Sequence, residues 1–134
     1  MIVVDSSVWI AYLRGRDSDA VRRLDSVILN RDDEILVGDL ILLEILQGAR
    51  DDTHAARIER NLRRFPVAPM LGIDVAIRAA ANYRTLRAKG VTVRKTIDII
   101  IIGSFCLLHG RVLLHEDRDF DPMANHLGLR VLLG

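Results

Sequence analysis

Strand-like and helix-like patterns alternate along the chain, beginning with a short run that is apolar on both faces. This run, Ile2 to Val4, is β-branched and typical of a strand buried in the middle of a parallel sheet. Asp5 ends it, and Ser6 and Ser7 are typical of a helix start. A carboxylate at the end of a central strand lies where open α/β sheets bind their ligands. The alternative is that Asp5 only caps the helix that begins near Ser7.

The remaining pattern predicts further helices and short strands. Helices are expected over Ser7–Leu13, from a cap at Ser18 to about Asn30, from a cap at Asp39 to about Gln47, and over His54–Arg64, Ile73–Lys89 and Pro122–Leu127. Strands are expected over Glu34–Val37, around Val67, over Arg111–Leu114 and, at the sheet edge, over Arg130–Leu133. Because right-handed crossovers return such strands to one sheet, the alternation predicts an α/β fold.

The isoleucine run that follows Asp98 is ambiguous by pattern. Four consecutive isoleucines favour a strand by propensity. The length from Ile97 to Leu108 instead fits a helix enclosed on most sides, with Thr96 or Asp98 near its start and Gly110 after its end. Propensity and length therefore point in opposite directions, and the pattern leaves both open.

Composition narrows the class of protein. The 134 residues suit a single domain, and a chain that is 50% hydrophobic but 4% aromatic needs an aliphatic core, as layered α/β folds have. A net charge of +1 excludes a strongly cationic nucleic-acid coat. Cys106 is the only cysteine, so no intramolecular disulfide forms, and no apolar run is long enough to cross a bilayer. We expect a soluble cytoplasmic protein with no membrane partner.

Glu44 is the only charged residue in the otherwise apolar stretch from Leu40 to Leu46. A lone carboxylate on a buried helix is costly unless it is paired, hydrogen-bonded or bound to a metal. The alternative is that Glu44 lies on a stripe that reaches solvent. Asp39 lies about 140° away around the same helix, so it cannot share the face of Glu44 and is better explained as a cap.

Further acids occur where a ligand crevice is expected. Asp98 stands at the start of a buried helix, and four acids from Glu116 to Asp121 follow the strand Arg111–Leu114. Together with Asp5 and Glu44 they can converge on one crevice, where oxygen-only ligands suit Mg²⁺ or Mn²⁺. Zinc is disfavoured because Cys106 stands alone and the four histidines lack ligand spacing. The alternative for the last group is an ordinary acidic loop in which Asp121 caps the next helix.

Basic residues are grouped in two places. Arg57, Arg60 and Arg64 form a stripe on one predicted helix, which could follow a phosphate backbone but is more commonly a solvated face. Arg94 and Lys95 precede Asp98 and are the nearest cations in sequence to the acids.

Four short segments, taken in order and spacing, make a fairly specific combination. They are Asp5-Ser6-Ser7-Val8-Trp9-Ile10, Leu43-Glu44-Ile45-Leu46-Gln47-Gly48, Thr96-Ile97-Asp98-Ile99-Ile100-Ile101 and Asp117-Arg118-Asp119-Phe120-Asp121. Over nearly its whole length the chain resembles the PIN-domain ribonucleases, specifically the VapC-type toxins of bacterial toxin–antitoxin pairs.

The resemblance implies a fold and a set of site residues. The fold would be a three-layer α/β/α PIN-like domain with a central, mostly parallel sheet, in which the isoleucine run is helical. The resemblance implies catalytic, metal-binding acids at Asp5, Glu44, Asp98 and Asp117, with Asp119 as a further ligand or supporting group, and hydroxyls that orient ligands or water at Ser6 and Thr96. His115 departs from many relatives, which have Thr or Ser there, and this departure puts the water-positioning role of that side chain in doubt.

The resemblance also implies a function. It predicts an endoribonuclease that uses Mg²⁺ or Mn²⁺ to hydrolyse phosphodiester bonds of tRNA or other structured RNA, leaving 5′-phosphate and 3′-hydroxyl ends. Arg94 and Lys95 would help to bind the RNA. The implied partners are a VapB-type antitoxin, which would place an Arg or Lys in the acidic pocket, and a second copy of the chain.

Two other functions stay open at the level of sequence. An aspartate-based phosphatase would use Asp5, but the second Asp usual two residues later is Ser7 here. A PIN-like module could bind RNA or protein without cutting, although the presence of all four acids argues against lost catalysis.

Overall fold

The computed structural model describes residues 1–31, 33–93 and 96–132. Arg94 and Lys95, predicted to bind RNA, lie outside these residues, as does the side chain of Thr96.

A parallel sheet of four short strands forms the centre of the described structure. The strands are β1 (Ile2–Val4), β2 (Ile35–Gly38), β3 (Val67–Ala68) and β4 (Val112–Leu114), in the order β3-β2-β1-β4. Every residue of β1 and β2 is buried, as their β-branched and aliphatic runs predict. The edge strand predicted over Arg130–Leu133 is confirmed only in part: within the described residues the segment pairs with β4 through one parallel bridge, from Leu113 to Val131.

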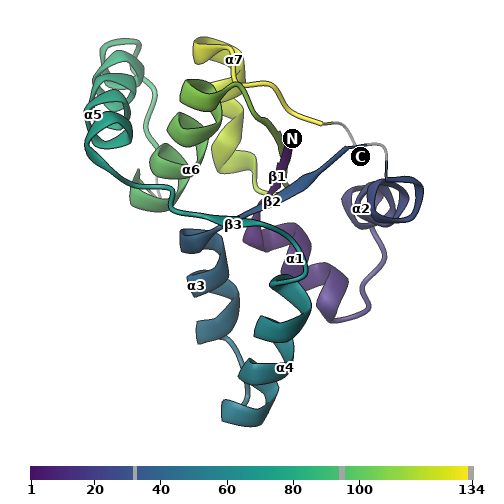
Figure 1. Ribbon diagram of the computed structural model, residues 1–134. Coiled ribbons are helices and arrows are strands. Elements are labelled where there is room, and N and C mark those ends of the chain that lie inside the picture. Colours follow the sequence, from purple (N-terminus) through teal and green to yellow (C-terminus); the bar gives the residue numbers. More distant parts are fainter. Residues whose placement is uncertain (32, 94–95, 133–134) are drawn as a thin grey trace.

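Helices cover both faces of the sheet (Figure 1). The first group is α1 (Ser6–Leu13), α2 (Asp19–Asn30), α3 (Asp39–Gln47) and α4 (Asp52–Leu62), and the second is α5 (Ile73–Ala88), α6 (Thr96–His109) and α7 (Asp121–Leu127). The chain steps from β1 to β2 to β3 in one direction, so right-handed crossovers place the first group on one face. The return to β4 places α5 and α6 on the other, which confirms the predicted three-layer α/β/α fold.

The isoleucine run is helical, as its length predicts and its strand propensity does not. Ile99, Ile100 and Ile102 are buried in α6, which packs against α5 and β4. Cys106 is also buried in this helix, and burial raises the pKa of its thiol to about 12, which keeps it protonated. Apolar contacts on several sides therefore favour a helix over the intrinsic preference of isoleucine.

Helix caps agree with the sequence in part. Ser18 and Asp51 cap α2 and α4, since their side chains accept hydrogen bonds from backbone N–H groups of the first turns. The cap predicted at Asp39 is wrong, because Gly38 is the N-cap of α3. The Oδ1 of Asp39 accepts the backbone N–H of the adjacent Leu40 at 2.8 Å and that of Met70 at 2.9 Å. Asp39 thus ties the start of α3 to the chain after β3.

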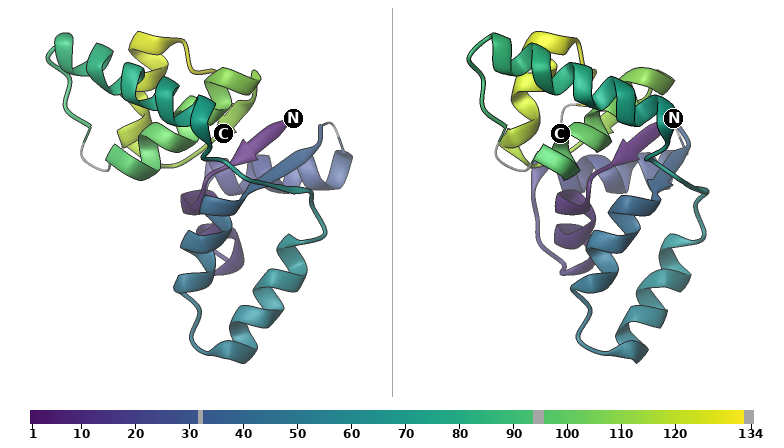
Figure 2. Two further views of the ribbon diagram at one scale, coloured as in Figure 1. Left: turned by 60° about the vertical axis from the view of Figure 1, so that its left-hand side comes forward. Right: turned by 90° about the vertical axis from the view of Figure 1, so that its left-hand side faces the viewer.

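Helices α3 and α4 form a hairpin that projects from the rest of the molecule (Figure 2). Helix α1 packs against α3, so the hairpin is anchored at the end of the sheet from which α1 starts. Among the residues that the structure describes, no helix combines the length and the apolar content needed to cross a membrane.

Candidate active site

Two of the four predicted acids follow neighbouring strands. Asp5 comes directly after β1 and Asp117 lies in the loop after β4, and the backbone N–H of Asp5 donates to the carbonyl of Leu114 at 2.9 Å. Strand order reverses between β1 and β4, because β2 and β3 lie on the other side of β1. In open parallel sheets this switch point is where the carboxyl ends of the strands leave a crevice.

The other two acids reach the crevice from helices on opposite faces of the sheet. Glu44 is half-buried in the middle of α3, and Asp98 is half-buried in the first turn of α6. A pocket of about 290 Å³ is lined by all four predicted acids and by Ser6, Ser7, Ile10, Gln47 and Ile99. The fold therefore brings together carboxylates from four separate elements, as the motif order predicts.

Asp5 is both a helix cap and a wall of the pocket. It is 5% exposed, and its Oδ2 accepts the backbone N–H of Ser7 at 3.0 Å and the Ser7 hydroxyl at 2.6 Å. Burial raises the pKa of Asp5, the Ser7 hydrogen bonds oppose this rise, and the nearby charge of Asp117 adds to it. Both contacts use Oδ2, and within the described residues Oδ1 accepts no hydrogen bond, which leaves this oxygen open to a ligand.

Glu44 shows most clearly how negative charge gathers among the described residues of the pocket. Burial, together with the charges of Asp98 and Asp5, raises the pKa of Glu44 from its ordinary 4.5 to about 7, while the Ser6 hydroxyl lowers it. Its Oε1 is buried and has no hydrogen-bond partner within the described residues. A cation bound among these carboxylates would relieve both the repulsion and the unpaired oxygen.

The donor set fits Mg²⁺ or Mn²⁺, because carboxylates and hydroxyls provide oxygen ligands alone. In the described part of the chain, however, no three His, Cys, Asp or Glu residues already stand close enough to form a coordination shell. The pocket thus supplies suitable ligand atoms, and metal binding would require its carboxylates to come closer together.

Ser7 is a site residue that sequence reasoning missed. Besides donating to Asp5, its hydroxyl accepts the backbone N–H of Glu116 at 3.1 Å, which ties the loop after β4 to the start of α1. The signal was present in the spacing, since a hydroxyl two residues after an Asp commonly bonds to it at a helix start. Ser6 also lines the pocket, on the side of Glu44.

The loop after β4 holds Asp117 through local contacts. Asp117 Oδ1 accepts the backbone N–H of Asp119 at 2.9 Å, and the backbone N–H of Asp117 donates to His115 Nδ1 at 3.1 Å. His115 packs against Phe120, and burial lowers the pKa of its imidazole. Asp119 is not among the described residues that line the pocket and contacts Asp117 only through its backbone N–H. Asp121 is the first residue of α7 rather than its cap.

The basic stripe of α4 does not reach the acids. Arg60, Arg63 and Arg64 line a separate hollow on the surface of the hairpin, and Arg63 pairs with Glu59 at 3.4 Å. Like these three residues, Arg57 is exposed, as expected of a solvated helix face.

Known proteins are similar to the chain in sequence. The PIN domain family matches residues 2–125. A VapC ribonuclease of Mycobacterium bovis and ribonuclease VapC11 of Mycobacterium tuberculosis are each 35% identical to the chain over 133 residues, which cover 97% of this chain and 96% of the relative.

Solved structures agree on the fold. A chain in the structure of VapBC2 from Rickettsia felis bound to promoter DNA has a TM-score of 0.76 at 13% identity, with 98% of both chains covered. A chain of a toxin–antitoxin complex from Klebsiella pneumoniae has a TM-score of 0.71 at 19% identity, with 98% of this chain and 96% of that chain covered. The family match, the identity to VapC ribonucleases and the shared fold together show that the chain belongs to the PIN-domain family, among its VapC-type members.

Proposed function

We propose that this protein is an endoribonuclease toxin of a type II toxin–antitoxin pair that hydrolyses phosphodiester bonds of tRNA or other structured RNA with Mg²⁺ or Mn²⁺. One observation carries the proposal: Asp5, Glu44, Asp98 and Asp117, from four separate elements, line one pocket at the switch point of the sheet. Its support from relatives is the 35% identity to proteins named VapC ribonucleases.

These four carboxylates would hold the metal. When bound, Mg²⁺ or Mn²⁺ supplies Lewis-acid activation of water and neutralises negative charge that develops on the phosphate. Ser7 orients Asp5, so that Oδ1 can face the ligand. Attack of water would leave 5′-phosphate and 3′-hydroxyl ends.

The toxin's partner would be a VapB-type antitoxin. Support comes from solved structures of the same fold, among them VapBC assemblies and a toxin–antitoxin complex. An Arg or Lys of the antitoxin placed in the pocket would neutralise the carboxylates and exclude the metal.

The toxin would also form a homodimer. Ile73 and Ile77 lie one turn apart on α5 and are 80% and 65% exposed, so they offer an apolar surface that a second copy could cover. Light scattering of the toxin in complex with its antitoxin tests this, since a mass with one toxin chain would contradict the dimer.

The proposed activity is tested by incubating total tRNA with purified, antitoxin-free protein in Mn²⁺, Mg²⁺ or EDTA. We expect cutting with either metal and none in EDTA or in Asp98→Asn. Asp74→Asn is the matched control, because Asp74 is an exposed acid on α5 and does not line the pocket. A folded wild type that cuts no RNA under any metal would contradict the proposal and favour the non-cleaving binding module.

A further inference from the structure

A second hollow opens beside the acidic pocket. It has a volume of about 380 Å³ and lies between α1 and the α3–α4 hairpin, with apolar walls that include Leu13, Ile45 and Ile58. Ile10 lines both this hollow and the acidic pocket, so one side chain separates the two. We call this second hollow, lined by Ile10, Leu13, Arg14, Ile45, Arg50 and His54 among others, the basic groove.

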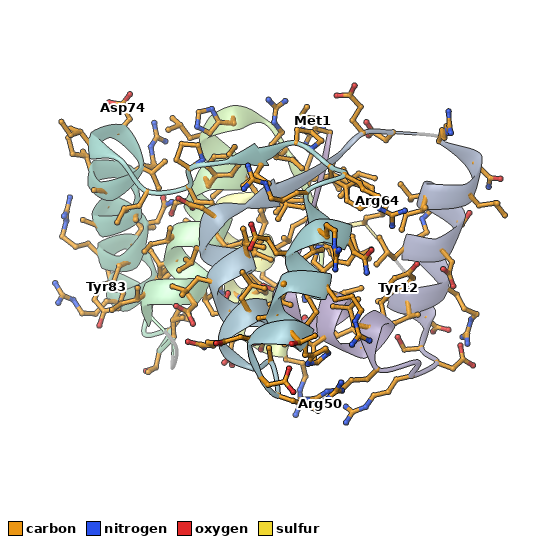
Figure 3. The ribbon with its side chains drawn as sticks, turned by 60° about the horizontal axis from the view of Figure 1, so that its bottom comes forward. Met1, Tyr12, Arg50, Arg64, Asp74 and Tyr83 are labelled. Atoms are coloured by element: carbon orange, nitrogen blue, oxygen red, sulfur yellow. The ribbon has the colours of Figure 1, made fainter. Side chains whose placement is uncertain are left out.

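The basic groove differs from the acidic pocket in charge. Arg14 follows α1, Arg50 lies in the turn between α3 and α4 (Figure 3), and His54 is in the first turn of α4. All its charged or titratable lining residues are basic, in contrast to the four acids across Ile10. A hollow with two arginines and a histidine thus adjoins, across Ile10, a pocket with four carboxylates.

Both arginines of the groove are available to a ligand. Arg14 and Arg50 are exposed, and within the described residues neither forms an ion pair, whereas Arg22 and Arg63 are paired with carboxylates. A guanidinium without a carboxylate partner keeps its full set of donors for a phosphate.

His54 adds a donor of defined identity. Its Nδ1 accepts the backbone N–H of Arg50 at 3.1 Å, so the proton of the neutral ring lies on Nε2. Nε2–H can therefore donate to a phosphate oxygen without the ring becoming charged.

RNA needs such a site, because carboxylates repel its backbone. The metal offsets that repulsion only at the phosphate being cut, so the free energy of binding has to come from cations beside the pocket. We propose that the basic groove binds the RNA backbone next to the cleaved bond, with Arg14 and Arg50 contacting the adjacent phosphate and Ile10 and Ile45 contacting the sugar or base. The inference rests on the proposed ribonuclease function and assigns the substrate's path across the site.

The test measures RNA binding without cleavage. In the Asp98→Asn background, the affinity for fluorescently labelled tRNA is measured by anisotropy over a series of NaCl concentrations for Arg14→Gln and Arg50→Gln. Arg84→Gln is the matched control, because it removes the same charge from an exposed arginine on α5, away from both hollows. Circular dichroism and urea denaturation verify that each variant folds.

Each groove variant should weaken tRNA binding about tenfold at low salt and lower the slope of log affinity against log salt by about 1, as loss of one phosphate contact does. Arg50→Lys should restore much of the affinity, since it restores the charge. Arg84→Gln should change neither quantity by more than about twofold.

Three results would overturn the inference. If the groove variants match Arg84→Gln while the protein with intact acids cuts tRNA, the RNA runs elsewhere and the proposed function stands. If they weaken binding of the antitoxin but not of tRNA, the groove is a protein interface. If the protein neither binds nor cuts tRNA, the proposed function and the inference fall together.

Discussion

The two oxygens of the Asp5 carboxylate serve different purposes, and the division depends on Ser7. Oδ2 is held by the hydroxyl and the backbone N–H of Ser7, while Oδ1 has no hydrogen-bond partner in the part of the chain that the structure describes. The hydroxyl of Ser7 also accepts a hydrogen bond from the loop that carries Asp117. One side chain thus fixes the geometry of two of the four acids.

Ser7→Ala should lower the free energy of unfolding by about 1–3 kcal/mol, because a buried carboxylate loses its hydroxyl donor. It should also raise the pKa of Asp5 further, since the Ser7 hydrogen bonds lower it, and so move the acidic limb of the pH–rate profile for RNA cleavage upward. Urea denaturation and cleavage rates measured across pH check the two effects. Thr53→Ala, an exposed hydroxyl on α4, is the control, and equal behaviour of the two variants would contradict the role of Ser7.

The raised pKa of Glu44 predicts that the stability of the protein depends on pH. The folded protein holds the Glu44 proton more tightly than the unfolded chain, since the pKa rises from 4.5 to about 7 on folding. Between these pH values the folded state binds more protons, so the free energy of unfolding of the metal-free protein should fall as the pH rises through this window. Glu44→Gln should flatten that fall in urea denaturation, whereas Asp74→Asn should not. If the free energy of unfolding of Glu44→Gln changes with pH as steeply as that of the wild type, the raised pKa of Glu44 is not the cause of the pH dependence.

The sequence predicted the roles of some residues better than those of others. Glu44 could be singled out because a lone charge in an apolar helix needs an explanation, and it does line the pocket. Asp39 was misread because its partner, the backbone N–H of Met70, is distant in sequence and comes close only through the pairing of β2 with β3. A contact of that kind leaves no local signal.

At the scale of elements, the helix α6 shows where propensity fails. Its isoleucines prefer strands, but α5 and the sheet bury them as a helix. The order and approximate bounds of the helices were readable from periodicity, caps and glycines. The length of the edge strand over Arg130–Leu133 was not, because an apolar run specifies burial, while the extent of pairing, here one bridge within the described residues, depends on how far the neighbouring strand extends.

The contact between α5 and α6 includes one buried hydrogen bond, from Asn82 Nδ2 to Ser104 Oγ at 2.9 Å. Apolar side chains alone allow two helices to slide, so this pair should help to fix the register of α6 and with it the position of Asp98.

A double-mutant cycle of Asn82→Ala and Ser104→Ala tests the pair. Each single variant should lower the free energy of unfolding by about 1–3 kcal/mol, because it leaves a buried polar partner unpaired. The double variant should cost less than the sum of the two, with a coupling energy of about 0.5–1.5 kcal/mol by urea denaturation. Strict additivity would show that the hydrogen bond contributes nothing to stability.

At the scale of the whole molecule, the topology assembles the site. The acids lie between residues 5 and 117, yet the reversal of strand order between β1 and β4 brings them to one pocket. The resemblance to PIN-domain ribonucleases predicted which four acids meet, whereas strand ends, helix starts and the lone charge of Glu44 indicated only the regions from which they come. They did not predict the basic groove, because its residues come from α1 and from the α3–α4 hairpin and meet only when these helices pack.

The most direct test of the site is the rate of tRNA cleavage in Mn²⁺ by variants of the four acids, measured one at a time. Asp5→Asn, Glu44→Gln, Asp98→Asn and Asp117→Asn should each lower the rate by about a hundredfold or more, because each removes a carboxylate proposed to hold the metal. Asp74→Asn should cleave at the wild-type rate. Wild-type rates in the pocket variants, with all proteins folded, would contradict the assignment of this pocket as the site of RNA cleavage.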